Sequence, residues 1–410
     1  EALDANTTAN SNTAIGKGSL SANNTGAENT ATGHGSMFTN TTGTLNVANG
    51  ADSLYYNTTG SNNVAIGHGS LQDNTTADNN TAVGFRALFD NTTGAKNTAV
   101  GVESLAANTT ASNNTAVGAY TLDANTTGDR NVAVGWAALS DNVTGDRSTA
   151  LGFATLQKQN PASNTDMYNT AVGYNAGNAI TTSTGNTLVG GLCGDAITTG
   201  NSNVAVGYLA LSSNTTASDN TAVGGAALNV NTTGASNTAV GHQALDANTT
   251  ASNNTAVGDS ALGANTTGFD NTALGVNTLL TNTTGDYNTA VGKNALYSAT
   301  TANYNTAVGF NAASDNTTGT ELAAFGAGAL GVNTTGSYNS AFGSGSLDAN
   351  TTGANLTAVG YGSLGANTTG NNNTALGYNV LSSNTTGQYN IAIGGNDSTN
   401  LSTLANNTTG

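Results

Sequence analysis

Proline, cysteine and charged side chains are nearly absent from this sequence. It holds one proline and one cysteine, and charged residues make up 7% of its 410 positions, against about 25% in a typical soluble domain. Disordered chains are usually rich in Pro, Glu, Lys and Ser, so the scarcity of proline and charge does not match disorder. The abundance of Gly, Asn, Thr and Ala instead indicates packed repeats in which turns supply many of the residues.

Positive charge is especially scarce, and this restricts the possible partners. The chain has 7 Lys and Arg against 23 Asp and Glu, which gives a formal net charge of −16. Nucleic acid is therefore not expected as a partner, because phosphate binding needs a basic surface. No run of 18 apolar residues exists, so we expect no membrane insertion in this segment. The single cysteine, Cys193, excludes a disulfide framework within the chain.

A glycine recurs every 17 residues along almost the whole chain, from Gly16 through Gly33 and Gly50 to Gly394. Of the 22 intervals between the 23 glycines of this series, 21 equal 17 residues and one is longer by four. The extra residues lie near 159–164 and include the only proline, Pro161. We expect a continuous array of about 23 coils over residues 1–394 with a loop at the insertion, and an irregular end over residues 395–410.

Each coil has the same order of residue types, counted here from its marked glycine as position 0. Position −2 is Ala in 22 of 23 coils, with Leu188 as the exception, and position +4 is Leu in 18 coils. Position −1 is mostly Val, Ile or Leu. Apart from Asp166 and Asp397, all charged residues lie at +1, +2, +5, +6, +11 or +12. We expect those six positions to face solvent and the others, including Val at −1 and Leu at +4, to be stacked or buried.

The period selects the fold class. Seventeen residues are too few for the helix pairs of common helical repeats, which need about 33 or more. The N-T-A-V segment alternates in the manner of a strand, with Thr and Val on one face and Asn and Ala on the other. The sequence therefore predicts an all-β parallel β-solenoid, or β-roll, with a second strand near A/S-L or N-T-T. Columns of Asn should then form hydrogen-bonded ladders along the stack.

The alanine at position −2 predicts close packing. An exposed column has no reason to be Ala in 22 coils, so Ala99, Ala116 and Ala133 should lie against another chain or against the second sheet of the same coil. From this column we infer self-association, as a homotrimer or as a lateral or end-to-end filament.

The repeated element A-V/I-G-x-x-A/S resembles the head repeats of YadA-like trimeric autotransporter adhesins. Similar N-T-A-V-G repeats occur in tail-fibre-like proteins that end in a self-cleaving chaperone domain. The resemblance extends from Glu1 to about Gly394 and implies a left-handed parallel β-roll, a parallel homotrimer and display outside a cell or on a virion. The coil here is longer than the familiar head coil, because it contains an additional N-T-T turn such as Asn91–Thr93.

Aromatic side chains are the candidate contact residues. Eight of them follow the marked glycine directly and would form columns that bind a glycan or protein receptor, or that pack neighbouring copies together: Phe85, Trp136, Phe153, Tyr174, Tyr208, Phe310, Tyr361 and Tyr378. Four tyrosines share position +12: Tyr287, Tyr304, Tyr338 and Tyr389.

The N-x-T sequons at position +7, such as Asn6, Asn91 and Asn350, are candidate glycan acceptors. The alternative is a stacked Asn/Thr ladder whose sequon form is incidental. His34, His68 and His242 share position +1 but have no carboxylate neighbours in a metal-ligand pattern. We expect no metal, no cofactor and no catalytic residues, because no nucleophile–base–acid set recurs.

These patterns favour a structural protein over an enzyme. The expected function is a rigid, repetitive fibre or filament segment on a cell or virion surface. An adhesin head that itself binds host matrix, glycans or neighbouring cells is the alternative. Aromatic columns that stay exposed in the assembled protein would favour the adhesin, and burial between copies would favour the filament.

Overall fold

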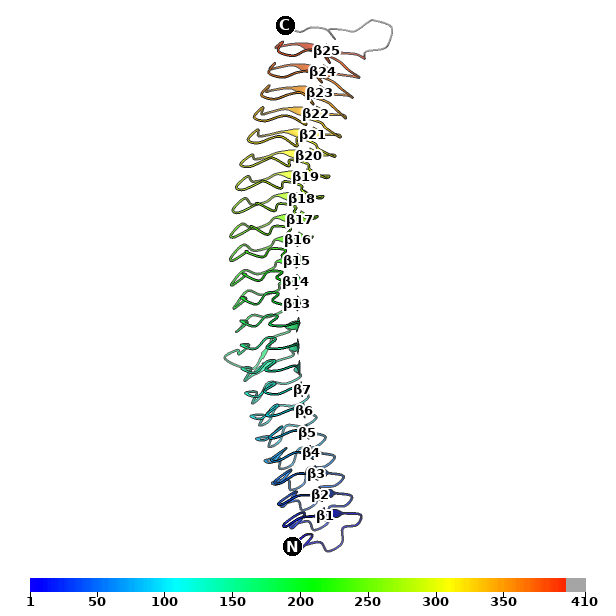
Figure 1. The fold of residues 1–410 in the computed structure, drawn as a ribbon, viewed down its shortest axis with the longest axis vertical. Helices are drawn as coiled ribbons and strands as arrows, with labels where there is room; N and C mark the ends of the chain where they lie inside the picture. The colour runs from blue at the N-terminus through cyan, green and yellow to red at the C-terminus, as the bar shows by residue number, and fades with distance from the viewer. Residues whose placement is uncertain (396–410) are drawn as a thin grey trace. The chain divides into compact units, whose positions relative to one another are not determined.

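The computed structural model describes residues 1–395. These residues divide into two compact units, Glu1–Asn203 and the described residues from Val204 onward. Apart from residue 395, the expected irregular end over 395–410 lies outside the described residues. Each unit is an all-β parallel β-solenoid with coils of 17 residues, and residues 1–395 contain no helix (Figure 1). The predicted fold class is confirmed.

Each coil contributes one three-residue strand ending just before its marked glycine. The strands of the first unit are β1 Thr13–Ile15, β2 Thr30–Thr32, β3 Val47–Asn49, β4 Val64–Ile66, β5 Thr81–Val83, β6 Thr98–Val100, β7 Thr115–Val117, β8 Val132–Val134, β10 Thr149–Leu151, β12 Thr170–Val172 and β13 Thr187–Val189, with a separate pair β9 Gly145–Asp146 and β11 Thr165–Asp166. Those of the second unit are β14 Val204–Val206, β15 Thr221–Val223, β16 Thr238–Val240, β17 Thr255–Val257, β18 Thr272–Leu274, β19 Thr289–Val291, β20 Thr306–Val308, β21 Ala323–Phe325, β22 Ser340–Phe342, β23 Thr357–Val359, β24 Thr374–Leu376 and β25 Ile391–Ile393.

Successive strands pair in parallel and in register, so like residues stack on like residues. Ala99 pairs with Ala116 and Ala116 with Ala133 in the first unit. In the second unit Ala239 pairs in the same way with Ala256. The 17-residue period fixes this register, because a slip of one residue would turn the buried face of every strand outward.

The predicted second strand is wrong. Between the marked glycine and the N-T-T turn the chain runs through turns, and the buried leucine at +4 adopts a left-handed backbone, with φ of 51° at Leu105 and 49° at Leu122. An extended strand cannot contain such a residue. Neighbouring coils still bond here, because the Leu105 N–H donates to the Thr121 carbonyl at 2.9 Å.

Six positions form the interior of a coil, among the eleven that were expected to be stacked or buried. In the coil of Gly101 the buried residues are Ser104, Leu105, Asn108, Ala111 and Asn114, followed by Ala116. The valine at −1 was predicted to be buried and lies instead on the outer face of the strand. Its neighbour Ala116 points inward, and only one face of a strand can face the interior.

The alanine column is buried inside its own coil. Ala99, Ala116 and Ala133 are each 0% exposed in a single chain. Two packing partners were expected for this column, another chain or the same coil. The same coil is enough to bury the alanines. The argument from the alanines to association between chains consequently loses its support.

The buried asparagines form two ladders, as predicted. At +7, the Asn108 side-chain amide donates to Asn91 Oδ1 at 2.7 Å and to the Ala111 carbonyl at 3.0 Å. At −4, Asn97 Oδ1 accepts the backbone N–H of Asn114 at 2.9 Å. Buried amides need such partners, because an unpaired buried polar group costs about 1–3 kcal/mol.

Leu188, the exception in the alanine column, compensates for missing leucines at +4. Position +4 is Gly177 in the coil that precedes Leu188 and Gly194 in the coil of Leu188 itself. A Cβ at Gly177 would lie 2.7 Å from Leu188 Cδ1, and one at Gly194 would lie 2.9 Å from Leu188 Cδ2. The larger residue thus fills the interior from the opposite wall, which keeps the packing dense.

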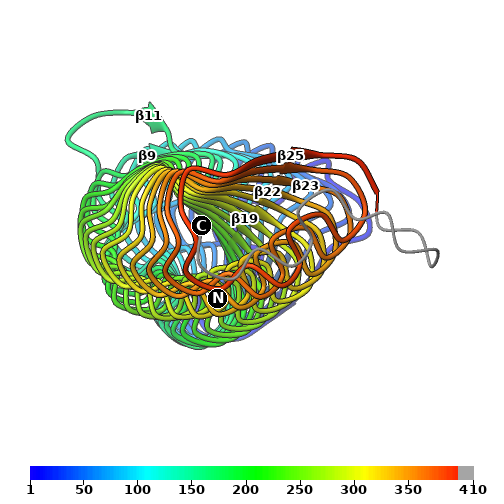
Figure 2. The ribbon, with the colours of Figure 1, turned by 90° about the horizontal axis from the view of Figure 1, so that it is seen from above.

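The insertion projects from the first unit without disturbing its sheet. β10 and β12, on either side of it, pair in register through Ala150 and Ala171. The loop leads into β11, which pairs with β9 beside the main sheet (Figure 2). Inside, the Gln159 amide continues the asparagine ladder by donating to Asn142 Oδ1 at 3.3 Å.

The asparagine ladder of the second unit has a gap at Ala299, which predicts a stabilising mutation. Asn282 Oδ1 is buried without a hydrogen-bond partner, because Ala299 takes the place of the next asparagine. We expect Ala299→Asn to bridge Asn282 and Asn316 and to raise the free energy of unfolding by about 1–2 kcal/mol. Thermal melting checks this, with Ala299→Leu as the control that fills space without a donor. If the Ala299→Asn and Ala299→Leu variants melted at the same temperature, the ladder hydrogen bonds would not contribute to stability.

Candidate functional site

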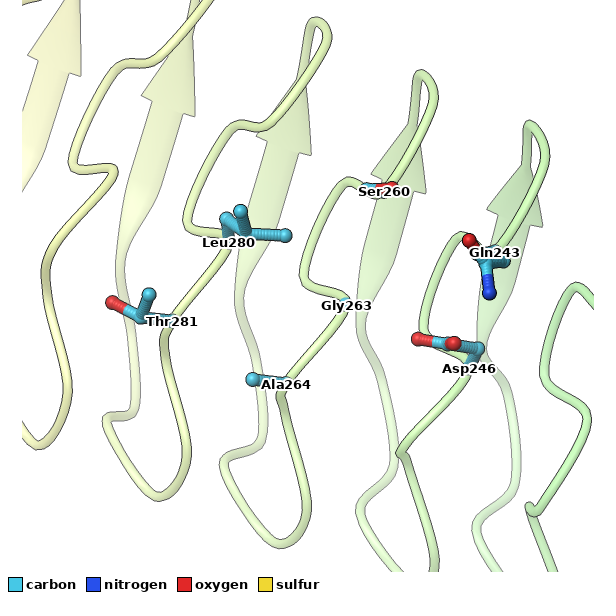
Figure 3. A pocket seen from close by; sticks show the side chains of 7 residues that line it. All are labelled: Gln243, Asp246, Ser260, Gly263, Ala264, Leu280 and Thr281. Atoms are coloured by element: carbon cyan, nitrogen blue, oxygen red, sulfur yellow. The ribbon is translucent and has the colours of Figure 1, made fainter.

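The surface of the coils is hollowed where small residues replace larger ones at +5. In the second unit, Gly263 lies between Asp246 of the preceding coil and Leu280 of the following coil (Figure 3). The hollow of about 320 Å³ is also lined by Gln243, Ser260, Ala264 and Thr281. Its polar groups are one carboxylate, one amide and two hydroxyls. This set offers both hydrogen-bond donors and acceptors.

Four carboxylates at +5 are partly withdrawn from water. Burial raises the pKa of Asp123 to about 6, and the negative charges of Asp141 and Glu103 add to the effect. Burial likewise raises the pKa of Asp195, Asp246 and Asp348. The charged forms of these groups are therefore less favourable in the folded chain than in the unfolded one.

Stability should consequently increase at mildly acidic pH. A raised carboxyl pKa contributes stability that is complete below the unfolded value of 3.8 and is lost as pH rises through about 6. We expect Asp123→Asn to raise the free energy of unfolding at pH 7.5 by about 1 kcal/mol, after allowance for solvent screening. It should also flatten the change in melting temperature between pH 4 and pH 7.5. The exposed Asp219→Asn is the matched control, and an equal effect there would contradict the explanation.

The aromatic residues at +1 lie on the surface of each coil and stack along it. Trp136 and Phe153 are 4.7 Å apart between ring centroids and stacked, and Phe153 stacks on Tyr174 at 5.4 Å. Tyr361 and Tyr378 form a second stack at 5.5 Å, and Phe85 stacks on His68. All eight predicted contact residues are between 44% and 62% exposed in the single chain: Phe85, Trp136, Phe153, Tyr174, Tyr208, Phe310, Tyr361 and Tyr378.

The four tyrosines at +12 are also exposed. Tyr287 and Tyr304 stack with 5.1 Å between their centroids. Tyr304 borders a hollow of about 480 Å³ together with Glu321, Leu322 and Ala323. Leu322 and Ala323 stand where most coils have Asn and Thr. Tyr338 and Tyr389 are 55% and 77% exposed.

The asparagines of the sequons point into the coils. Asn91 and Asn350 are 0% exposed, and their amide nitrogens donate to Asn74 and Asn333 in the ladder. Asn6, in the first coil, is exposed, and its amide donates to the Ala9 carbonyl. A glycan on Asn91 or Asn350 would disrupt the folded coil, so the geometry favours the ladder interpretation at these two positions.

The histidines and the cysteine take no part in a larger reactive cluster. Within residues 1–395 no group of three or more His, Cys, Asp and Glu side chains is placed to hold a metal ion. His34 Nδ1 lies 3.7 Å from Asp52 Oδ1. Cys193 is buried at +3, and its burial raises the pKa of the thiol to about 12, so the reactive thiolate is disfavoured.

The outer face of the sheet is the surface that sequence reasoning missed. It carries an apolar column at −1, including Ile66 at 40% and Val134 at 37% exposed in the first unit, and Leu274 at 47% in the second. Phe325 and Phe342 stack on this face with 4.9 Å between centroids. The clue was in the sequence: position −1 directly follows the alanine at −2, and neighbouring residues of a strand cannot share a face.

Comparisons with known proteins add no family assignment: no family model matches the chain, and no curated protein matches it. Among the described residues, no helix is long and apolar enough to span a membrane.

Proposed function

We propose that this chain is a structural segment of an extracellular fibre, a repetitive shaft on the surface of a cell or virion that is built from parallel copies of itself. The proposal rests on one observation: the outer strand face presents a column at −1 that is apolar in most coils, beside the column at −3 that is mostly Thr. Soluble monomers rarely expose contiguous apolar surface of this kind, and such surface commonly marks an interface.

A second copy of the same chain is the partner that fits this face. The apolar groups recur once per coil, at the spacing between paired strands, which is about 4.8 Å. A partner that covers each of them needs the same spacing, and an identical solenoid lying parallel supplies it. Three copies around a common axis are expected from the resemblance to trimeric adhesin heads. The low positive charge and the absence of a recurring catalytic set support a structural role.

The association test uses Val100 and Val117, which pair in β6 and β7 and point outward. We expect the wild-type protein to sediment at three times the mass of one chain at micromolar concentration. The double variant Val100→Lys/Val117→Lys should weaken association, because each interface would bury unpaired charges. Thr93→Lys/Thr110→Lys, at exposed turn positions, is the control. A wild-type protein that sediments as a single chain would refute the proposal.

An adhesin head is the second candidate, favoured by the exposed aromatic stacks. Trp136 is the only tryptophan, so its fluorescence reports on one stack alone. In the assembled protein, efficient quenching of Trp136 by acrylamide would show an open stack and favour the adhesin. If Trp136 is shielded from acrylamide in the wild type and becomes accessible in the Val100→Lys/Val117→Lys variant, the stack lies between copies. That result would favour the fibre. Antibody labelling of intact particles tests surface display for both.

A further inference from the structure

We propose that a hollow bordered by His34, Asp52, Tyr55, Tyr56 and Gln72 in the first unit binds a saccharide through a single sugar ring. The hollow measures about 260 Å³ and is formed by three successive coils. It would provide the adhesin role with a ligand class, and it is complete within one chain, because all five residues belong to three coils of that chain.

Two tyrosine rings border this saccharide hollow. Tyr55 stacks on Phe38 with 5.1 Å between centroids and an angle of 7°, which fixes its orientation. Tyr56 meets Tyr55 edge to face at 4.7 Å and is 47% exposed. The two rings provide apolar contact surface beside polar hydroxyl groups, a combination that suits the C–H face of a sugar.

Polar groups border the rest of the hollow. Asp52 supplies carboxylate acceptors, His34 an imidazole and Gln72 an amide that both donates and accepts. The carboxylate lies 3.7 Å from His34 Nδ1, and its side chain is 35% exposed, so it remains accessible to a ligand. The lining is mostly polar, with two tyrosine rings at its border, which suits a ligand as rich in hydroxyl groups as a sugar. The volume, slightly below the roughly 300–1,000 Å³ of drug-sized pockets, suits one sugar ring.

Gly35 keeps the hollow open. A Cβ at this position would lie 2.6 Å from Asp52 Oδ1 and 3.0 Å from Tyr55 Cε2. The backbone itself does not require glycine here: Ala137, Ala154 and Ala226 occupy the same position +2 of their coils with φ between 49° and 57°. An alanine at Gly35 would therefore displace the carboxylate and the ring with little effect on the coil.

Gly328 provides a matched control for that substitution. It also occupies position +2, its φ of 66° equals that of Gly35 within a degree, and a Cβ there would have nothing within 4 Å. Gly35→Ala and Gly328→Ala thus make the same change to the backbone, and only the first reaches the hollow. Tyr56→Ala removes an exposed ring and is a second variant that leaves the interior intact.

The experiment is saturation-transfer NMR on the assembled protein with the methyl glycosides of glucose, galactose, mannose, fucose and N-acetylglucosamine as probes. We expect at least one probe to bind with a Kd in the millimolar range, as a shallow site for one ring allows. Gly35→Ala and Tyr56→Ala should each weaken its binding at least tenfold, while Gly328→Ala leaves it unchanged. The inference is overturned if no probe binds, or if Gly35→Ala and Gly328→Ala behave alike. Sedimentation of the same samples separates failure of this site from failure of self-association.

Discussion

Replacing Gly309 with alanine should unfold part of the second unit, with a loss of more than 3 kcal/mol in the free energy of unfolding. Gly309 has a φ of +141°, which L side chains rarely adopt, and a Cβ would lie 2.5 Å from the carbonyl oxygen of Gly326 in the next coil. Both effects act together, because the backbones of successive coils meet at the marked glycines. Thermal or denaturant unfolding measures the loss.

Gly225→Ala is the control for this prediction. Gly225 directly follows a marked glycine, its φ is not positive, and the nearest atom to an added Cβ is His242 Cδ2 at 3.6 Å. We expect this variant to unfold within about 0.5 kcal/mol of the wild type, as surface substitutions usually do. If Gly309→Ala were equally harmless, neighbouring coils could not approach as closely as described.

Replacing Ala116 with lysine should be similarly severe. The side chain is 0% exposed, between Ala99 and Ala133 in the inward column, so the ammonium group would be buried without a partner. We expect a loss of at least 3 kcal/mol or local unfolding of the coil. Ala116→Leu should cost about 1–3 kcal/mol through overpacking alone.

Val102→Lys is the matched control, because Val102 is 41% exposed at position +1. Since Ala116 packs within its own coil, its variants should lower the melting temperature of a single chain as well as of an assembly. A variant that changed only the mass of the assembly and not the stability of the chain would contradict the inward placement.

The choice of strand face shows where sequence reasoning succeeded and where it failed. Alternation correctly separated Ala116 from Val117 and required close packing around the alanine. It did not say which face was inside, and hydrophobicity alone favoured burial of valine. The interior instead accommodates alanine opposite the leucine at +4, together with asparagines whose polar atoms are satisfied by ladder bonds.

The candidate sites divide in the same way. The aromatic residues at +1 were recognised from the sequence, because they share the positions that carry charge. The saccharide hollow was not, because its residues come from three coils and its space depends on the missing side chain of Gly35. The repeat shows which residue types stack at the same position of successive coils. It gives no information on contacts between residues at different positions.

By itself, the sequence determined the period, the parallel in-register stacking and the asparagine ladders, since a 17-residue repeat leaves few other ways to pair identical strands. The tertiary structure decided which residues face inward, the turns that replace a second strand, and the apolar outer face. The coil turns at the leucine at +4, whose backbone is left-handed, and alternation along the strand places position −1 outside once the alanine is inside. Such a conformation is set by the packing of successive coils and is not favoured by leucine itself.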